Sequence, residues 1–296
     1  MKCLVTGASG MLGVTLCPIF RNKGFSILAS DINPVFKDIV VLDITDKEKV
    51  RKIIQDCKPD VIFHLAAETD VDRCQLDKKH AFEINAYGTK NIAEECKDND
   101  IILVYISSGS VFNGKKLSGY SENDIPDPVN VYAKSKLEGE EIIKSKLAKY
   151  YIVRAGWMFG GYDLDKKFVR KIIDLLGSAK EIPVVIDKMG TLTFTVDLAV
   201  ALAEIIKFDS FGIYHCVNEG ICTRFDIAKY LAGLLGKTDV KLIPVKSDFF
   251  ANLAPRGDSE ALINARLNME GKKLMRNWKE VLKEYVGNFK GNKLHD

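Results

Sequence analysis

No apolar run in the sequence reaches the roughly 18 residues that a membrane-spanning helix needs. The first residues, MKCLVTGASG, also lack the charged, apolar and small-residue segments of a signal peptide. The seven cysteines form an odd set without a CxxC pair, which argues against a disulfide framework and favours reduced thiols in a protein core. Together these absences predict a cytoplasmic protein without a membrane segment.

An excess of one charge and a metal-ligand cluster are missing as well. The 43 Lys and Arg residues nearly balance the 40 Asp and Glu residues, which leaves a formal net charge of +3 over 296 residues. That excess is too small to argue for binding to nucleic acid or to an anionic membrane surface. The four histidines are scattered without metal-ligand spacing, so we expect no metal site. The remaining composition, 47% hydrophobic and 28% charged, is that of a globular protein.

Short apolar segments alternate with amphipathic segments along the first half of the chain. The apolar segments show no alternation with period two, which is typical of parallel strands that are covered on both faces. Parallel pairs need crossover connections, usually helices, so the pattern predicts an α/β fold with a doubly wound parallel sheet of the Rossmann type. The expected strands are 2–6, 25–31, 60–67, 101–108 and 150–156. The expected helices are 11–22, 46–56, 77–97 and 130–148.

The alternation changes after residue 156, which suggests a second domain. A helix at 165–177 and a strand at 182–187 come first, and then helix 195–207 and strand 212–217 return to the sheet. We predict a dinucleotide-binding domain of residues 1–156 and 195–221. A smaller, discontinuous C-terminal substrate-binding domain is expected from 157–194 and 222–296, with a frayed tail from residue 287.

A glycine-rich turn, TGASGMLG, lies between the first expected strand and the first expected helix. Such a turn needs glycine where φ is positive and where the backbone approaches a pyrophosphate, and the helix N-terminus offers N–H groups to the anion. The spacing of Gly7, Gly10 and Gly13 is GxxGxxG rather than GxGxxG, so the position of the turn carries the prediction. The alternative is a tight strand-to-helix turn without a ligand.

Two acidic residues follow strands near this turn. Asp31 ends the second strand, where a carboxylate accepts hydrogen bonds from ribose hydroxyls and repels a 2′-phosphate. It therefore favours NAD over NADP, although Lys37 is close enough in sequence to soften the preference. The alternative role for Asp31 is capping of a turn. Asp43 and Ile44 follow a short third strand, where either an adenine contact or a helix N-cap is compatible with the sequence.

A tyrosine and a lysine four residues apart begin the helix expected at 130–148. Tyr132 and Lys136 share a helix face, and a nearby ammonium is expected to lower the pKa of a phenol that must exchange a proton. Ten tyrosines and 34 lysines predict about one such pair by chance, and Tyr162 with Lys166 forms a second copy. Only Tyr132 follows a strand that ends at the ligand edge of a doubly wound sheet, in Ser107-Ser108. We therefore predict that Tyr132, Lys136 and Ser108 are catalytic.

These motifs resemble the extended short-chain dehydrogenase/reductases, most closely the dTDP-4-dehydrorhamnose reductase family. The resemblance extends from Met1 to about residue 287 and is carried by the following segments: TGASGMLG (6–13), HLAAETDVDRC (64–74), INAYGTKNIA (84–93), ISSGSVFNG (106–114), VNVYAKSKLEGE (129–140), IVRAGWMFG (152–160), DKMGTLTF (187–194), GIYHCVNEG (212–220) and APRGDSEAL (254–262).

The resemblance implies a role for each matching residue. It places NAD or NADP against Gly7, Gly10, Met11, Leu12, Gly13, Asp31, Asp43, Ile44, Ala66, Ala67, Glu68, Thr69, Asn85, Tyr132 and Lys136. It implies that Asn85 also positions the active-site helices. It implies that Ser108, Gly109 and Trp157 contact the sugar of a nucleotide-sugar substrate, and that Arg256 approaches its diphosphate. A homodimer is suggested by the family alone.

The expected activity is the NAD(P)H-dependent reduction of the 4-keto group of a nucleotide-activated deoxysugar. Two departures from the family affect the substrate side. Family members usually carry Ser-Thr-Asp-Tyr-Val-Phe where this chain has Ser107-Ser108-Gly109-Ser110-Val111-Phe112. They carry Arg-Pro-x-x-Ser where this chain has Arg256-Gly257-Asp258-Ser259-Glu260. The pocket wall therefore loses an acid and an aromatic ring, which puts the identity of the sugar in doubt.

Two other activities remain open at this stage. One is a nucleotide-sugar epimerase or dehydratase of the same superfamily, although Gly109 and Ser110 offer no additional acid or base. The other is a non-catalytic NAD(P)-binding regulatory subunit that resembles the beta subunit of methionine adenosyltransferase.

Overall fold

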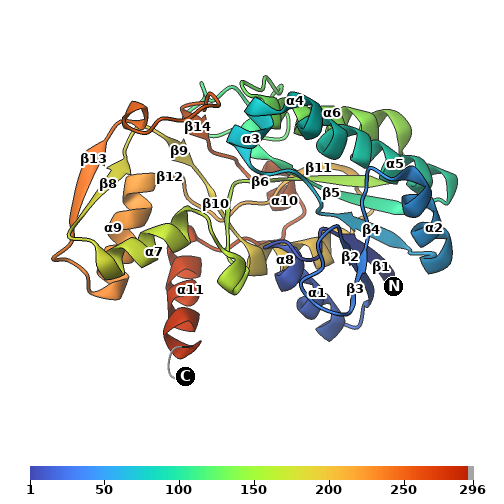
Figure 1. The fold of residues 1–296 in the computed structure, drawn as a ribbon, viewed down its shortest axis with the longest axis horizontal. Coiled ribbons are helices and arrows are strands. Elements are labelled where there is room, and N and C mark those ends of the chain that lie inside the picture. The colour runs from blue at the N-terminus through green and yellow to red at the C-terminus, as the bar shows by residue number, and fades with distance from the viewer. Residues whose placement is uncertain (293–296) are drawn as a thin grey trace.

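A seven-stranded parallel sheet forms the centre of the protein (Figure 1). The computed structural model describes residues 1–292. The strands of the sheet are β1 (Lys2–Thr6), β2 (Ser26–Asp31), β3 (Ile39–Val41), β4 (Val61–His64), β5 (Ile102–Ser108), β6 (Tyr150–Ala155) and β11 (Gly212–His215), in the order β11-β6-β5-β4-β1-β2-β3. The chain runs outward from β1 to β3 and then returns to β4 on the other side of β1. The predicted doubly wound fold is confirmed, and its ligand edge lies at the carboxyl ends of β1 and β4.

Helices cover both faces of this sheet (Figure 1). The helices α1 (Gly13–Asn22) and α8 (Thr195–Ile205) pack on one face, and α2 (Lys47–Cys57), α5 (Thr89–Asp98) and α6 (Val131–Lys146) pack on the other. Successive residues of β1 belong to different layers, since Cys3 and Val5 contact the first layer and Leu4 contacts the second. Both faces of β1 are therefore buried, which explains why the strand is uniformly apolar. All seven cysteines are buried free thiols.

The single helix predicted over 77–97 is wrong in its detail. The chain forms α3 (Val71–Leu76), α4 (Lys78–Phe82), a π-helical turn (Glu83–Gly88) and then α5. The π-turn contains Asn85, whose carbonyl oxygen accepts a hydrogen bond from the Thr89 hydroxyl at 2.8 Å. Insertions of this kind are frequent at functional sites, and the apolar periodicity of the segment does not reveal them.

A second group of elements lies at the left in Figure 1. It contains β7 (Trp157–Phe159), α7 (Phe168–Ser178), β8 (Glu181–Val185), β9 (Met189–Gly190), β10 (Leu192–Phe194), β12 (Cys222–Thr223), α9 (Arg224–Leu235), β13 (Lys241–Val245), β14 (Ser259–Glu260) and α11 (Trp278–Asn292). The remaining short helix, α10 (Ala265–Met269), packs against β11. The helices α7, α9 and α11 share one buried apolar cluster.

This separate cluster is compatible with the predicted division into two domains, which remains a prediction. The chain leaves the main sheet at Gly156, where a Cβ atom would lie 2.2 Å from the carbonyl oxygen of Thr191. The tail is not frayed from residue 287, because α11 continues to Asn292. Residues 293–296 of the predicted second domain lie outside the described part.

Candidate functional site

The glycine-rich turn lies at the carboxyl end of β1, as predicted. Gly7 has φ +71°, and a Cβ atom there would lie 2.6 Å from the backbone nitrogen of Ala66. The N–H groups of Met11 and Leu12 make no backbone hydrogen bond within the described residues. A positive φ, a close backbone approach and free N–H groups at the start of α1 fit a pyrophosphate. These features of the turn favour the ligand-binding interpretation over a turn without a ligand.

Substitution of alanine at two glycines of this turn, Gly13 and Gly10, is predicted to have different effects. A Cβ atom at Gly13 would lie 2.5 Å from the Cα of Ala8, whereas one at the exposed Gly10 would meet only the Gly7 oxygen at 3.2 Å. Gly13→Ala should therefore lower the free energy of unfolding by about 1–3 kcal/mol. Gly10→Ala should keep that stability and raise the Kd for NADH about tenfold or more, because the added methyl group faces the expected pyrophosphate. Denaturant titration measures the stability and NADH fluorescence measures the Kd. If the two variants change stability and Kd equally, the assignment of Gly13 to packing and Gly10 to pyrophosphate binding is contradicted.

Asp31 is anchored at the end of β2. Its carboxylate accepts hydrogen bonds from the N–H groups of Ser9 and Asn33, both at 2.9 Å. It therefore caps its own turn and at the same time contacts the glycine-rich turn. A carboxylate has about four acceptor positions, so it retains the capacity to bind ribose hydroxyls. Both interpretations of Asp31 are compatible with this geometry, and the preference for NAD remains a prediction.

Asp43 does not cap the following helix. Its carboxylate accepts from the N–H and hydroxyl of Thr45, while Asp46 caps α2 by accepting from the N–H of Lys49 at 3.1 Å. The side chain of Ile44 is buried and lies against Gly88. The Asp43 side chain thus stays available for the predicted contact with adenine. Ile44 can contribute only backbone groups to such a contact.

The loop of Ala66, Ala67, Glu68 and Thr69 follows β4 and is fixed by Asn85. The Asn85 amide accepts from the Glu68 N–H at 2.9 Å and donates to its carbonyl oxygen at 3.1 Å and to the Ser135 hydroxyl at 2.9 Å. Asn85 is fully buried, and its amide is occupied by the protein. It therefore holds this loop against α6, and its contact with the cofactor remains a prediction.

The three predicted catalytic residues come together at the same edge of the sheet. Ser108 ends β5, and Tyr132 and Lys136 lie in the first two turns of α6. The side chains of Ser108 and Tyr132 lie close enough for Ser108 to lower the pKa of Tyr132 against the larger effect of burial. The Lys136 side chain is buried, and its ammonium lies 4.0 Å from the ring centroid of Tyr105. Asn130 caps the helix by accepting from the N–H of Ala133 at 2.9 Å, which fixes the start of this helix.

Burial dominates the acidity of these groups. It raises the pKa of Tyr132 to about 12, opposed by the smaller effect of Ser108. It lowers the pKa of Lys136 to about 7, opposed by the charge of Glu140. The Lys136 ammonium was expected to lower the pKa of Tyr132. The protein without its cofactor does not show this lowering, because burial disfavours both the phenolate and the ammonium. The phenol is held as a proton donor.

A buried ion pair stands behind Lys136. Glu140 accepts from the Nε of Arg154 at 3.0 Å and from its Nη2 at 2.6 Å, and the Ser107 hydroxyl donates to Glu140 at 2.5 Å. Both charged side chains are almost completely buried. Glu140 thus connects α6 to Arg154 of β6 and to Ser107 of β5, one helical turn after Lys136.

His64 is a buried core residue. Its ring nitrogens lie 2.8 Å from the Thr6 hydroxyl and 3.0 Å from the Thr89 hydroxyl. Burial lowers its pKa to about 3, with a smaller contribution from the charge of Lys136, so the ring stays neutral.

The second tyrosine–lysine pair differs in context, since Tyr162 begins a short 3-10 turn (Tyr162–Leu164) instead of a helix after a sheet strand.

The predicted substrate side holds two residues, Glu260 and Arg224, to which the sequence assigned no role. Glu260 of β14 accepts a hydrogen bond from the Ser110 hydroxyl and another from the indole N–H of Trp157, both at 2.6 Å. The guanidinium carbon of Arg224 lies 3.9 Å from the Trp157 ring centroid. Burial lowers the pKa of Arg224 to about 10, opposed by the charge of Glu260. No local spacing links these residues, so only the fold reveals them.

Trp157 and Arg256, which the resemblance places against the substrate, both contact neighbouring groups of the protein. The backbone of Gly190 packs against the indole ring, since a Cβ atom there would lie 2.5 Å from two ring carbons. Arg256 donates to the carbonyl oxygen of Ala254 at 2.9 Å and to the Asp72 carboxylate at 3.0 Å. Its charge is near enough to lower the pKa of Arg224, so the two guanidinium groups lie in the same region of the protein.

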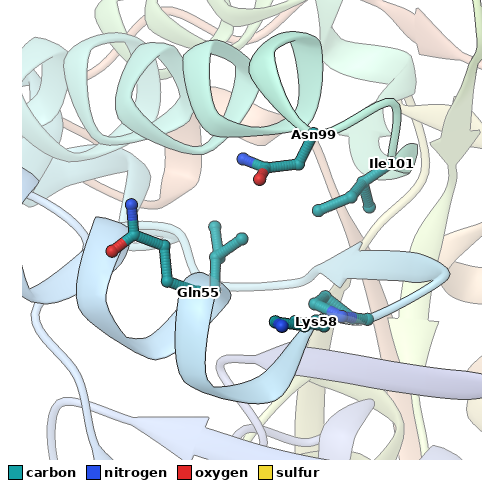
Figure 2. Close-up of a pocket in the computed structure, with 6 residues that line it drawn as sticks. Gln55, Lys58, Asn99 and Ile101 are labelled. Atoms are coloured by element: carbon teal, nitrogen blue, oxygen red, sulfur yellow. The ribbon is translucent and has the colours of Figure 1, made fainter.

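A hollow of about 330 Å³ lies elsewhere in the molecule (Figure 2). It is lined by the end of α2 and by the segment between α5 and β5, from which Gln55, Lys58, Asn99 and Ile101 are labelled in Figure 2. Lys58 and Asn99 directly follow helices, and Ile101 precedes β5, so the hollow lies at the amino ends of the strands. It is at the wrong edge of the sheet for the predicted ligand.

Within residues 1–292, no helix is long and apolar enough to cross a membrane. The same residues contain no group of three or more His, Cys, Asp or Glu side chains that would hold a metal ion.

Comparisons with known proteins agree with this architecture. The model of the family described as RmlD substrate binding domain matches residues 1–290. The spore coat polysaccharide biosynthesis protein SpsK of Bacillus subtilis is 32% identical over 96% of this chain and 96% of its own. A crystal structure of a dTDP-4-dehydrorhamnose reductase from Clostridium acetobutylicum is 36% identical, covers 98% of this chain and 100% of its own, and superimposes with a TM-score of 0.91. Another from Bacillus anthracis, in complex with NADP, is 33% identical, covers 97% and 99%, and has a TM-score of 0.90.

Proposed function

This chain belongs to the RmlD substrate binding domain family, and on that basis we propose that it is an NAD(P)H-dependent reductase of the 4-keto group of a nucleotide-activated deoxysugar. The observation that carries the proposal is the convergence of Ser108, Tyr132 and Lys136 beside the glycine-rich turn at the carboxyl edge of the sheet. Relatives over nearly the whole chain are reductases of this kind.

A dinucleotide bound at this site would supply the hydride that reduces the carbonyl carbon. The residues of this chain bind it through the turn of Gly7 to Gly13, with Asp31 at the adenosine ribose. Tyr132 donates a proton to the carbonyl oxygen as negative charge develops there, and Ser108 hydrogen-bonds to the same oxygen. Lys136 holds the ribose next to the nicotinamide. Burial of the phenol suits this direction of proton transfer, because it keeps Tyr132 protonated.

Turnover is the decisive test. We expect oxidation of NADH or NADPH, followed at 340 nm, in the presence of dTDP-4-keto-6-deoxy sugars and not with the dTDP-hexoses that lack the keto group. Comparison of the two cofactors measures the preference predicted from Asp31. Binding of the dinucleotide without turnover of any keto sugar would favour the non-catalytic regulatory subunit.

The remaining partner assignments are proposals as well. A nucleotide-sugar is the substrate class that the family supports. The homodimer and the cytoplasmic location come from the resemblance and from the composition. Light scattering of the purified chain measures the oligomeric state directly.

A further inference from the structure

Three glycines allow the C-terminal segment to approach the loop after β5. A Cβ atom at Gly114 would lie 2.5 Å from the Cα of Gly257, and one at Gly109 would lie 3.1 Å from the carbonyl oxygen of Glu260. Larger side chains at these positions would push the two segments apart. Gly109 and Gly257, both departures from the family, thus act together. They allow the Glu260 carboxylate of β14 to reach the loop after β5, where the family carries an aspartate that this chain lacks.

Glu260 is held in place with binding capacity to spare. Its two oxygens each accept one hydrogen bond, from Ser110 and from Trp157. A carboxylate has about four acceptor positions, so about two remain for a ligand. The hydroxyl of Ser110 in turn lies 3.2 Å from that of Ser108, which places Glu260 two hydrogen bonds away from the hydroxyl next to Tyr132.

Arg224 supplies donors opposite this carboxylate. Its guanidinium packs on Trp157 and on Phe168, at 3.9 and 4.6 Å from the ring centroids, and makes no hydrogen bond within the described part of the chain. The charges of Arg224 and Glu260 act on each other, yet no ion pair within 4.0 Å joins them in residues 1–292. An acceptor and a donor of opposite charge therefore both contact Trp157.

The chemistry of this acceptor and this donor selects one kind of ligand group. A hydroxyl donates to a carboxylate and at the same time accepts from a guanidinium, whereas a ketone or a phosphate offers no proton to the carboxylate and a deoxy carbon offers neither function. We propose that Glu260 and Arg224 together recognise the sugar hydroxyl adjacent to the reacting carbonyl, and so determine which nucleotide-sugar this enzyme accepts. The inference rests on the proposed function and specifies its substrate.

The test compares two substrates that differ in one oxygen. We expect the kcat/KM of the wild-type protein for a dTDP-4-keto-6-deoxyhexose to exceed that for its 3-deoxy analogue about 100-fold, since a site that hydrogen-bonds a substrate hydroxyl discriminates strongly against its absence. Glu260→Ala and Arg224→Met should reduce this ratio to below about 5, and Glu260→Gln, which retains an acceptor, should give an intermediate ratio. Glu138→Ala, at an exposed carboxylate of α6, is the matched control and should retain the wild-type ratio.

The ratio separates recognition from a structural role. Loss of packing around Trp157 would lower kcat/KM for both sugars equally and leave the ratio unchanged, which would overturn the inference. A wild-type ratio near 1 would overturn it as well, while the proposed function stands. If the wild-type protein reduces neither sugar, calorimetric titration of the same pair with the NAD⁺ complex decides independently. Tighter binding of the hydroxylated sugar, lost in Glu260→Ala, then supports the recognition and refutes the reductase, and equal binding refutes both.

Discussion

Replacement of Tyr132 by phenylalanine is expected to lower kcat by a factor of about 100 to 10,000 while NADH binds with nearly unchanged affinity. The change removes one oxygen and leaves the ring in place, so the cofactor contacts and the packing of α6 are retained. Because burial raises the pKa of Tyr132 to about 12, the phenol of the wild-type protein stays protonated below that pH. The proton for reduction therefore remains available, and we expect no loss of reductase rate from tyrosine ionisation up to about pH 9.

Steady-state oxidation of NADH and fluorescence titration measure the two quantities. The control is Tyr87→Phe, at a tyrosine whose side chain is 58% exposed, and it should leave kcat and Kd unchanged. Retention of more than about a tenth of kcat in Tyr132→Phe would show that another group donates the proton. A decline of the wild-type rate with rising pH near neutrality would instead indicate that a different group, with a lower pKa, limits the reaction.

Replacement of Glu140 by alanine is expected to lower the free energy of unfolding by about 3–5 kcal/mol, because it leaves the Arg154 guanidinium charged and without its partner in the core. The two side chains are 0% and 1% exposed and share two hydrogen bonds. The Ser107 hydroxyl loses its acceptor as well. Urea denaturation followed by circular dichroism measures the effect.

A double variant distinguishes the unpaired charge from the lost volume. Glu140→Met combined with Arg154→Met removes both charges, so it should be less destabilised than Glu140→Ala alone. Glu138→Ala, two residues earlier on the exposed side of the same helix, should change stability by less than about 0.5 kcal/mol. A Glu140→Ala protein as stable as the wild type would mean that water reaches Arg154, and the pair would then carry no structural role.

The predictions that depend on a single element agree best with the structure. The glycine-rich turn follows β1 because glycine, strand and helix are adjacent in the chain. Tyr132 and Lys136 share one face of α6 because their spacing of four residues matches the helical repeat. The break of the helix predicted over 77–97 was not visible, because a π-turn leaves the apolar pattern almost unchanged and depends on the hydrogen bonds of Asn85 to residues outside it.

The sequence by itself therefore determined the parallel sheet, the glycine-rich turn after its first strand and the helix face that Tyr132 and Lys136 share, because local periodicity and backbone geometry suffice for each. Only the tertiary structure brought together the residues that we propose to face the sugar. Glu260 meets Ser110 and Trp157 across 150 and 103 residues of chain, and Arg224 joins them from a third segment. Such contacts depend on how closely whole segments pack. Glycines permit this packing, but a glycine in the sequence does not indicate which segment will pack against it.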